Sequence, residues 1–395
     1  MRKKVVLESS VFFWDNSQHG LLYDWISSAT LSFSEQDPAI RSLCEQWKDL
    51  DNLYAAYFDA LEEETQVYAF VKAIVDKGLG AIYDADAPVV SFPPVLKVNH
   101  SVERKDYFGG LESQALLPYL VHLRVYIGGL SDGGVWWKQV AYPKDSAEHL
   151  DAKRLFRFLQ CCDLHSLTQI DLVISDWDEK VISEFFFGFA ILNLINKVRF
   201  IFAHPDPGFN NDILGKLAEE GFSITQVCLP NVGLKKGNWI EGRNYQFLVR
   251  SEEDAEQWEE LVGENPSVRY DYKPIADDNL DFFRKNVFLS EAEILGQKLS
   301  KKEIFRHQAL NVNQFGTLHI FPDGTIHPAA DAPTIGTLED SVHQTIIREL
   351  EENYAWRQTR DQMTPCKDCL YRYLCPSPSV YEKFFGVPGC TYWKE

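Results

Sequence analysis

Residues 365–390 read PCKDCLYRYLCPSPSVYEKFFGVPGC, and this stretch contains four of the chain's eight cysteines. Cys366, Cys369 and Cys375 follow a C-x2-C-x5-C pattern, and Cys390 ends the stretch. Two thiolates separated by only two residues can point toward a common centre, as they do in zinc and iron–sulfur sites. The spacing therefore predicts a metal centre that is held by these four cysteines.

A disulfide framework is the competing explanation for clustered cysteines. The chain has 395 residues and begins MRKKVVLESS, which lacks the apolar segment of a secretory signal. We therefore expect a cytoplasmic protein, and in a reducing cytosol clustered cysteines bind metal more often than they form disulfides. Spacing alone does not choose between a [4Fe–4S] cluster and Zn²⁺, because both accept four thiolates.

Charge argues against nucleic acid as a partner, and hydropathy argues against a membrane-spanning segment. The chain carries 39 basic and 58 acidic residues, a net charge of −19, so its surface repels phosphate backbones and nucleic acid is not expected. No apolar run is long enough to span a bilayer, and the longest, from Phe185 to Ile195, predicts a buried helix. A basic peptide or a basic protein face fits this charge better.

The first hundred residues predict a small α+β domain. VVLESSVFFW and GLLYDWIS, separated by a polar turn at residues 15–18, are typical of an antiparallel hairpin. Pro38 opens a helix with apolar side chains three and four residues apart, and a second helix is expected from Thr65 to Lys77. Strands followed by helices in so short a span indicate a winged-helix-like domain, and DADAPVVSFPPVLK at 84–97 resembles a linker.

Strands and helices alternate in the middle of the chain. Six β-branched, apolar runs begin near residues 122, 168, 197, 222, 244 and 266, with helical patterns such as 181–196 and 211–220 between them. This alternation predicts βα units around a parallel sheet. A complete eight-fold barrel needs more residues than 120–289 supply, so an open, partial barrel is expected.

The last ninety residues begin with a hairpin, FGTLHIFPDGTIHPAA, whose turn is set by Pro322, Asp323 and Gly324. A helix is expected over 341–360, just before the cysteines. We therefore divide the chain into domains at 1–100, 101–300 and 301–395.

The C-terminal region resembles a SPASM domain, the auxiliary iron–sulfur module of radical SAM enzymes that mature ribosomally synthesised peptides. The family pairs a P-D-G hairpin with C-x2-C-x5-C and a distal cysteine. Here residues 322–324 and Cys366, Cys369 and Cys375 stand in place, and Cys390 fits the distal ligand. The string from 366 to 382 is similar to the SPASM end of Bacteroidales systems whose precursor peptides carry Gly-Gly leaders.

Three positions depart from the family pattern. Ala329 follows Gly324 by five residues, and Ser379 follows Cys375 by four, where the family has cysteines. Before the hairpin, Asn311 and Asn313 occupy the stretch of a third missing cysteine. In the family these positions belong to one auxiliary cluster and the four retained cysteines to the other. The resemblance therefore implies that one cluster is lost as a unit and one is complete.

The radical SAM core is expected to be inactive. Its catalytic cluster needs C-x3-C-x2-C after the first barrel strand, but HLRVYIGG is followed here by LSDGGVWWKQ, which has no cysteine. Without three thiolates the cluster cannot form and SAM cannot be cleaved reductively, so no SAM is expected. Trp136 and Trp137 in this loop either fill the vacated cofactor space or simply pack in the core.

The fold class expected from these observations is α/β multidomain: a winged-helix-like domain, a degenerate radical-SAM-type partial (β/α) barrel and a SPASM-like iron–sulfur domain. The predicted function is that of a pseudo-radical-SAM protein without catalytic residues, acting with an active radical SAM maturase on a precursor peptide. Its one [4Fe–4S] cluster would be structural or an electron relay. The alternatives are an iron–sulfur electron-transfer protein or maturase that uses this cluster, and a structural zinc adaptor.

The N-terminal domain is a candidate for leader-peptide recognition by strand addition at an exposed sheet edge. The predicted edge lies in Val11–Trp14 or Leu21–Ile26. The other cysteines, at positions 44, 161, 162 and 228, are predicted to be small core residues. His319 and His327 lie on the hairpin, and a hydrogen-bonded surface or core role is favoured for both over an approach to the cluster.

Overall fold

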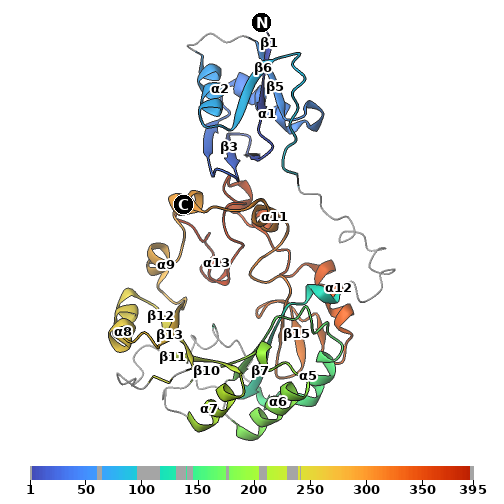
Figure 1. Cartoon of the computed structure of the whole chain (residues 1–395), viewed down its shortest axis with the longest axis vertical. Helices are drawn as coiled ribbons and strands as arrows, with labels where there is room; N and C mark the ends of the chain where they lie inside the picture. Colours follow the sequence, from blue (N-terminus) through green and yellow to red (C-terminus); the bar gives the residue numbers. More distant parts are fainter. Residues whose placement is uncertain are drawn as a thin grey trace.

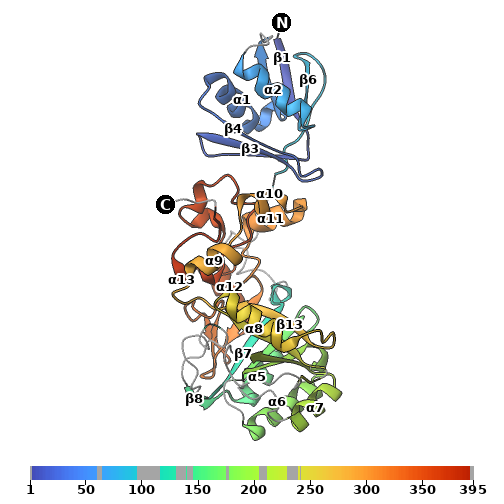
Figure 2. The ribbon, with the colours of Figure 1, turned by 90° about the vertical axis from the view of Figure 1, so that its left-hand side faces the viewer.

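The computed structural model describes residues 2–59, 65–95, 116–129, 139, 146–174, 178–203, 211–228, 239–240 and 242–391. Figures 1 and 2 show an N-terminal body at one end of an elongated molecule and a large sheet with its helices at the other. We call residues 280–391 the C-terminal segment. The part of this segment that contains the cysteine-rich stretch lies between the N-terminal body and the large sheet.

The N-terminal body contains two three-stranded antiparallel sheets around a shared apolar core. One sheet has the order β5-β1-β6, with β1 at Arg2–Leu7, β5 at Ala55–Asp59 and β6 at Gly80–Asp84. The other has the order β2-β3-β4, with β2 at Val11–Asp15, β3 at His19–Asp24 and β4 at Thr30–Ser34. The predicted hairpin is therefore correct and gains a third strand.

Both predicted N-terminal helices are present. Helix α1 spans Pro38–Lys48, and its N-cap Asp37 accepts hydrogen bonds from the backbone of Ala39 and Ile40. Helix α2 spans Gln66–Asp76 and is capped by Thr65. Their apolar stripes face the core between the sheets, which is where spacings of three and four residues place them.

The β2-β3-β4 sheet is buried on both faces. Val11 and Leu22 point into the N-terminal core, while Phe12, Trp14, Leu21 and Tyr23 pack against residues of the C-terminal segment. The Tyr23 hydroxyl donates to the Gln297 carbonyl at 3.3 Å. The N-terminal body therefore rests on the C-terminal segment through one face of strands β2 and β3, while β4 is not part of this apolar contact.

Six parallel strands form the middle of the chain, in the sheet order β13-β12-β11-β10-β9-β7. They are β7 (His122–Gly129), β9 (Gln169–Ile174), β10 (Val198–Ala203), β11 (Ser223–Cys228), β12 (Asn244–Val249) and β13 (Arg269–Pro274). The intervening helices are α5 (Ala152–Leu159), α6 (Glu179–Ile191), α7 (Asn211–Glu219) and α8 (Glu252–Val262). A short strand, β8 (Ser146–His149), pairs with β7. All six predicted strands are confirmed.

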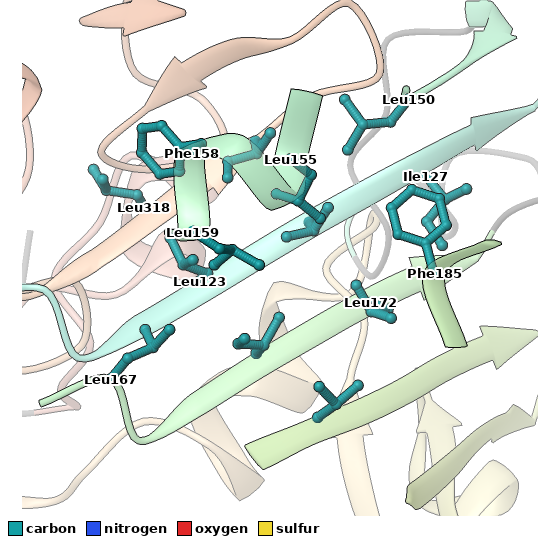
Figure 3. Packing of buried hydrophobic residues seen from close by; sticks show 14 of the residues in the cluster. Leu123, Ile127, Leu150, Leu155, Phe158, Leu159, Leu167, Leu172, Phe185 and Leu318 are labelled. Carbon is teal, nitrogen blue, oxygen red and sulfur yellow. The ribbon is translucent and has the colours of Figure 1, made fainter. Parts of the chain in front are cut away.

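The sheet curls toward a partial barrel. Five strand spacings separate β7 from β13, which would place them about 24 Å apart in a flat sheet. Nevertheless Arg124 of β7 and Lys273 of β13 line one cavity and affect each other electrostatically. The concave face holds a small apolar cluster that includes Tyr126, Val227 and Leu248. The convex face carries the main core, where α5 and α6 cover β7 and β9 (Figure 3).

The predicted buried helix at 185–195 is only partly correct. Phe185 and Phe189 of α6 are fully buried, but Phe187 and Ile191 are 62% and 83% exposed. The helix lies on the outside of the sheet, so one stripe alone is covered. Within the described residues, no helix is both long and apolar enough to cross a membrane.

The C-terminal segment continues the sheet before it reaches the cysteines. Strand β14 (Thr317–Ile320) pairs in parallel with β7 and in an antiparallel hairpin with β15 (Thr325–His327), beside which lies β16 (Gly336–Thr337). The hairpin turn is as predicted, with Gly324 at a φ of +83°. Short helices surround the segment: α9 (Leu280–Asn286), α10 (Glu291–Gly296), α11 (Lys301–Ala309) and α13 (Val380–Phe385).

The helix expected over 341–360 is shorter than predicted. Helix α12 spans Val342–Glu352 and ends at Asn353, which has a left-handed conformation. The buried Glu349 carboxylate accepts hydrogen bonds from the backbone N–H groups of Ala355 and Trp356 at 2.9 and 2.7 Å. This carboxylate turns the chain out of the helix, an effect that helix periodicity does not reveal.

Candidate functional site: a cysteine cluster and a neighbouring cavity

The four predicted ligands come from three short pieces of chain. Cys366 opens a single 3-10 turn, in which the Cys369 N–H donates to the Cys366 carbonyl at 2.9 Å. Cys375 follows a second turn, where its N–H donates to the Tyr371 carbonyl at 2.9 Å. Cys390 is held by a bridge to Leu289, which lies two residues before the start of α10. Local turns thus fix the first three cysteines, and a long-range bridge fixes the fourth.

Burial governs the chemistry of these thiols. It raises the pKa of Cys366 and Cys369, and the pKa of Cys375 to about 12. A negative charge on Cys390 also raises the pKa of each of these three thiols, so all four cysteines are near enough to interact electrostatically. Even so, no three ligand side chains among the described residues lie close enough to hold a metal ion. The thiols influence one another electrostatically, and their binding of a metal stays a prediction.

A buried ion pair lies at the centre of this arrangement. Arg360 Nη1 is 2.8 Å from Glu382 Oε1 and 3.3 Å from Cys366 Sγ, and both charged side chains are at most 6% exposed. Arg360 Nε donates to the carbonyl of Pro376, which follows Cys375, and Glu382 Oε1 accepts from the N–H of Gly389, which precedes Cys390. The Arg360–Glu382 pair therefore connects all three cysteine-bearing pieces of chain.

Sequence reasoning missed this pair, although one signal was available. Ser379 and Glu382 form a capping box at the start of α13, in which each side chain bonds the backbone of the other residue. The S-x-x-E spacing is a known mark of a helix start. It would have placed Glu382 in a first helical turn, where a buried cation can reach it.

Both definite positions without cysteines, Ala329 and Ser379, meet in space, and so does Asn311 from the third stretch, whereas Asn313 is not part of the cavity lining. Asn311, Ala329 and Ser379 line one cavity of about 230 Å³, together with Gln314, Asp331, Met363 and Lys383. In the sequence these three residues are separated by up to 68 positions, since Asn311 and Ser379 lie at the two ends. The predicted loss of one complete ligand set thus corresponds to one place in the structure, which we call the vacated cavity.

Amide side chains join the chain segments beside the vacated cavity. Asn313 Nδ2 donates to the Ser377 carbonyl at 3.2 Å and Asn311 Nδ2 to the Pro378 carbonyl at 3.4 Å. The Ser377 hydroxyl accepts from the Val312 N–H at 3.0 Å. These bonds link the segment before the hairpin to the segment before α13.

Replacing Asn313 with Ala is expected to lower the free energy of unfolding by about 0.5–1.5 kcal/mol, because the Ser377 carbonyl loses its side-chain donor while Asn311 still donates to the Pro378 carbonyl. Urea unfolding followed by tryptophan fluorescence measures the change. Asn265→Ala is the control. Asn265 lies at an exposed turn, where its side chain accepts from the Ser267 N–H, and its replacement is expected to have a smaller effect. Equal stability of N313A and wild type would contradict a linking role.

Of the two predicted leader-peptide edges, Leu21–Ile26 is wrong, whereas Val11–Trp14 lies in an outer strand whose backbone is partly occupied. Strand β3, which contains Leu21, lies between β2 and β4, so neither of its edges is open. The edge of β2 is blocked by Tyr54, whose hydroxyl donates to the Val11 carbonyl at 2.7 Å and accepts from the Phe13 N–H. Within the described residues, β2 and β4 are the two outer strands of this sheet, and Tyr54 occupies only the backbone of β2.

A cavity of about 360 Å³ lies where β4 meets the cysteine-rich stretch. Its walls include Ser32 and Phe33 from β4 and residues 368–371, which contain Cys369. Asn16 Nδ2 donates to the Asp368 carbonyl at 3.0 Å and fastens the two parts together. The outer edge of the N-terminal sheet therefore opens onto the loop that carries a predicted ligand.

The remaining sequence candidates have ordinary roles or differ from expectation. His319 and His327 are buried and hydrogen bonded, His319 to the Tyr126 hydroxyl at 3.0 Å and His327 to the Ala332 carbonyl at 2.8 Å. Cys44 and Cys228 are buried as predicted. The core prediction is wrong for Cys161, which is exposed, and Cys162 is half-buried. Trp136 and Trp137 lie outside the described residues.

No protein-family model and no curated protein matches this chain. Among solved structures, it is similar to Streptococcus suis SuiB bound to precursor peptide SuiA, with 11% identity, a TM-score of 0.43, and 98% of this chain and 97% of that chain covered. It is also similar to SuiB bound to S-adenosylmethionine, with 10% identity, a TM-score of 0.41, and 98% of each chain covered. A third similar structure is native anSMEcpe with bound AdoMet and Cp18Cys peptide, with 10% identity, a TM-score of 0.41, and 64% of this chain and 88% of that chain covered.

Proposed function

We propose that this chain is a non-catalytic, radical-SAM-like partner protein of a cytoplasmic peptide-maturation system, and that it keeps one of two auxiliary iron–sulfur clusters. One observation carries the proposal: Ala329 and Ser379, where the family has cysteines, line a single cavity with Asn311, one of the two residues in the stretch of the third missing cysteine. Chance substitutions at unrelated positions would not be expected to meet in space. The charge of Cys390 acts on each of the other three retained cysteines, and one of them, Cys366, accepts from Arg360 of the Arg360–Glu382 pair.

Cys366, Cys369, Cys375 and Cys390 would hold a [4Fe–4S] cluster, which when bound could relay electrons or fasten the fold. Four protein thiolates leave no ligand position for a substrate, so a catalytic role for this centre is disfavoured. The neighbouring Arg360 suits a negatively charged cluster, because its charge favours the thiolate form of Cys366 and Cys375 and acts against the effect of burial. A structural zinc site and an electron-transfer protein are the remaining alternatives.

The absence of catalysis is tested with the anaerobically reconstituted protein, SAM and a strong reductant. We expect no 5′-deoxyadenosine above the level without protein, because residues 130–139 supply no cysteine for a catalytic cluster. Formation of 5′-deoxyadenosine by the pure chain would overturn the proposal. Co-purification with an active maturase from the same system tests the partner role separately.

The precursor peptide would add as a strand to β4. The Asp24 N–H donates to the Ala29 carbonyl and the Glu35 N–H to the Gln18 carbonyl, so alternation turns the backbone groups of Thr30, Ser32 and Ser34 away from β3. Ser32 also lines the cavity beside residues 368–371. A peptide strand at this edge would thus gain main-chain hydrogen bonds and lie beside the loop that carries Cys369.

Replacing Ser32 with Pro is expected to weaken binding of a leader peptide ending in Gly-Gly at least about tenfold, through loss of main-chain hydrogen bonds and a clash with the added strand. The Ser32 N–H faces outward, so the change removes no bond within the sheet. Fluorescence anisotropy with a labelled synthetic leader measures the affinity.

Ile82→Pro is the matched control, because the N–H of Ile82 faces outward at the edge of the other sheet, on β6. It should bind the leader as wild type does. If I82P lost binding while S32P kept it, the peptide site would belong to β6 and α2 instead.

A further inference from the structure

A second cavity, of about 340 Å³, lies between the concave face of the parallel sheet and helix α13. The α13 wall is largely apolar, and its Val380 and Phe384 are 51% and 53% exposed. The sheet wall includes Lys273, a half-buried residue near the end of β13. The cavity therefore combines an amine with an uncovered apolar surface.

Charges of both signs surround this cavity. Four charged side chains of the sheet act on Lys273, two of them basic and two acidic: Arg124, Arg199, Asp171 and Asp271. Asp331, which also lines the cavity, pairs with Lys383. Since cations and acids are both present, the surroundings give little preference for an ion of either sign, and they are compatible with a neutral ligand.

The Lys273 amine is the nucleophilic group of this cavity. Within the described part of the chain, it makes neither a hydrogen bond nor an ion pair. Burial lowers its pKa to about 8, with Arg124 and Arg199 acting in the same direction and Asp271 and Asp171 against it. At pH 7 about one tenth of such an amine is neutral, against fewer than about one in a thousand for an ordinary lysine. Only the neutral amine has a lone pair that can attack a carbonyl carbon.

We infer that Lys273 captures a neutral aldehyde as an imine, with the apolar group of the aldehyde packed against Val380 and Phe384. The amine nitrogen adds to the carbonyl carbon, and a proton moves from nitrogen to oxygen to give a carbinolamine. The hydroxyl then leaves with the remaining N–H proton as one molecule of water, and a C=N bond forms, so no oxidant or reductant is consumed. The Tyr126 hydroxyl and the His319 ring, hydrogen bonded at 3.0 Å, line the same cavity and can carry these protons.

The space extends beyond this cavity, which shares four lining residues with the vacated cavity: Gln314, Asp331, Val380 and Lys383. The two spaces therefore adjoin, and an aldehyde larger than one side chain has room. The aldehyde could be a free molecule or part of a peptide, and the chemistry at Lys273 is the same in both cases. A site of this kind needs neither the cluster nor a maturase, so it can fail while the proposed function stands.

The test traps the imine in the full chain with cyanoborohydride, which reduces the C=N bond to a stable amine. The probes are 3-phenylpropanal, propanal and the peptide aldehyde N-acetyl-glycyl-phenylalaninal, and peptide mass mapping follows each lysine separately. At pH 7, 3-phenylpropanal should modify Lys273 at least about tenfold faster than Lys216, which is exposed on α7. The rate at Lys273 should rise from pH 6 to 8 and level off above about pH 9, where the amine is mostly neutral.

The apolar wall is tested by the choice of aldehyde. 3-Phenylpropanal should modify Lys273 at least about fivefold faster than propanal, because its ring is removed from water against α13. Phe384→Ala should remove most of this preference. Phe187→Ala is the matched control, since Phe187 is an exposed phenylalanine on the outer helix α6, and it should leave the preference unchanged.

The inference is overturned if Lys273 forms no adduct, or if it reacts no faster than Lys216 at pH 7. Equal rates with propanal and 3-phenylpropanal in the wild type would also overturn it, and this comparison needs no variant. So would an F384A variant that folds, by circular dichroism, and keeps the full preference of F187A. Faster capture of the peptide aldehyde assigns the site to a peptide, and faster capture of 3-phenylpropanal assigns it to a small molecule; either result supports an imine-forming lysine.

Discussion

Replacing Arg360 with Met should lower the free energy of unfolding by about 3–5 kcal/mol, because it leaves the Glu382 carboxylate buried without its partner. The same change removes the donor to Cys366 Sγ and to the Pro376 carbonyl. Urea unfolding of the full chain, followed by tryptophan fluorescence, measures the loss. An exposed pair provides the control: Lys285→Met removes a cation that lies 2.7 Å from Glu252, and it should cost about 0–1 kcal/mol.

A double variant separates charge from packing. In Arg360→Met with Glu382→Leu, neither residue leaves a buried charge, so much of the lost stability should return. If R360M destabilised no more than K285M, the buried pair would not hold the three cysteine-bearing pieces of chain together. If the double variant were less stable than R360M, the hydrogen bonds of Glu382 to Gly389 and Ser379 would outweigh its charge.

Replacing Cys390 with Ser is expected to abolish most of the bound iron and the broad visible absorption of the reconstituted protein, because a [4Fe–4S] cluster needs four thiolates from the chain. It should also lower the midpoint of thermal unfolding, since metal-binding free energy adds to folding free energy. Cys390 is the informative choice because the bridge to Leu289, and not the C-x2-C turn, holds it in place.

Cys161→Ser is the matched control, because Cys161 is a free cysteine that lies exposed at the end of α5, away from the cluster sequence. It should keep its iron and its thermal midpoint. Retention of full iron content by C390S would remove Cys390 from the ligand set. An equal loss in both variants would indicate metal bound without specificity.

Local patterns in the sequence were sufficient for most elements. The spacing of Ile40, Leu43 and Trp47 predicts a buried helical stripe, and α1 buries these residues. The six β-branched runs predict strands, and each one forms a strand of the parallel sheet. Patterns of this kind succeed because they describe contacts within one element.

The failures concern contacts between elements. VFFW at 11–14 is a continuous apolar run, which is typical of a strand buried on both faces. It was assigned to an open edge, whereas Phe12 and Trp14 pack on the C-terminal segment and Tyr54 blocks the β2 backbone. Similarly, Ile191 looks buried in a run of apolar residues but lies on the outer face of α6. Neither contact can be read from one segment alone.

The sequence predicts ligands for the candidate site but not their surroundings. The cysteine spacing points to Cys366, Cys369, Cys375 and Cys390, and the resemblance to SPASM domains marks where further cysteines are missing. Only the fold brings Asn311, Ala329 and Ser379 around one cavity and places the Arg360–Glu382 pair beside Cys366. The curl of the sheet likewise brings Arg124 of β7 and Lys273 of β13 to one cavity, although five strand spacings separate these two strands.

The most direct test of the central claim is the metal and sulfide content of the wild-type chain after anaerobic purification and reconstitution. One retained cluster predicts about four iron atoms and about four sulfides per chain. One zinc ion per chain without sulfide, or about twice that amount of iron, would contradict the account, because the first removes the cluster and the second restores the one that Asn311, Ala329 and Ser379 are proposed to have lost.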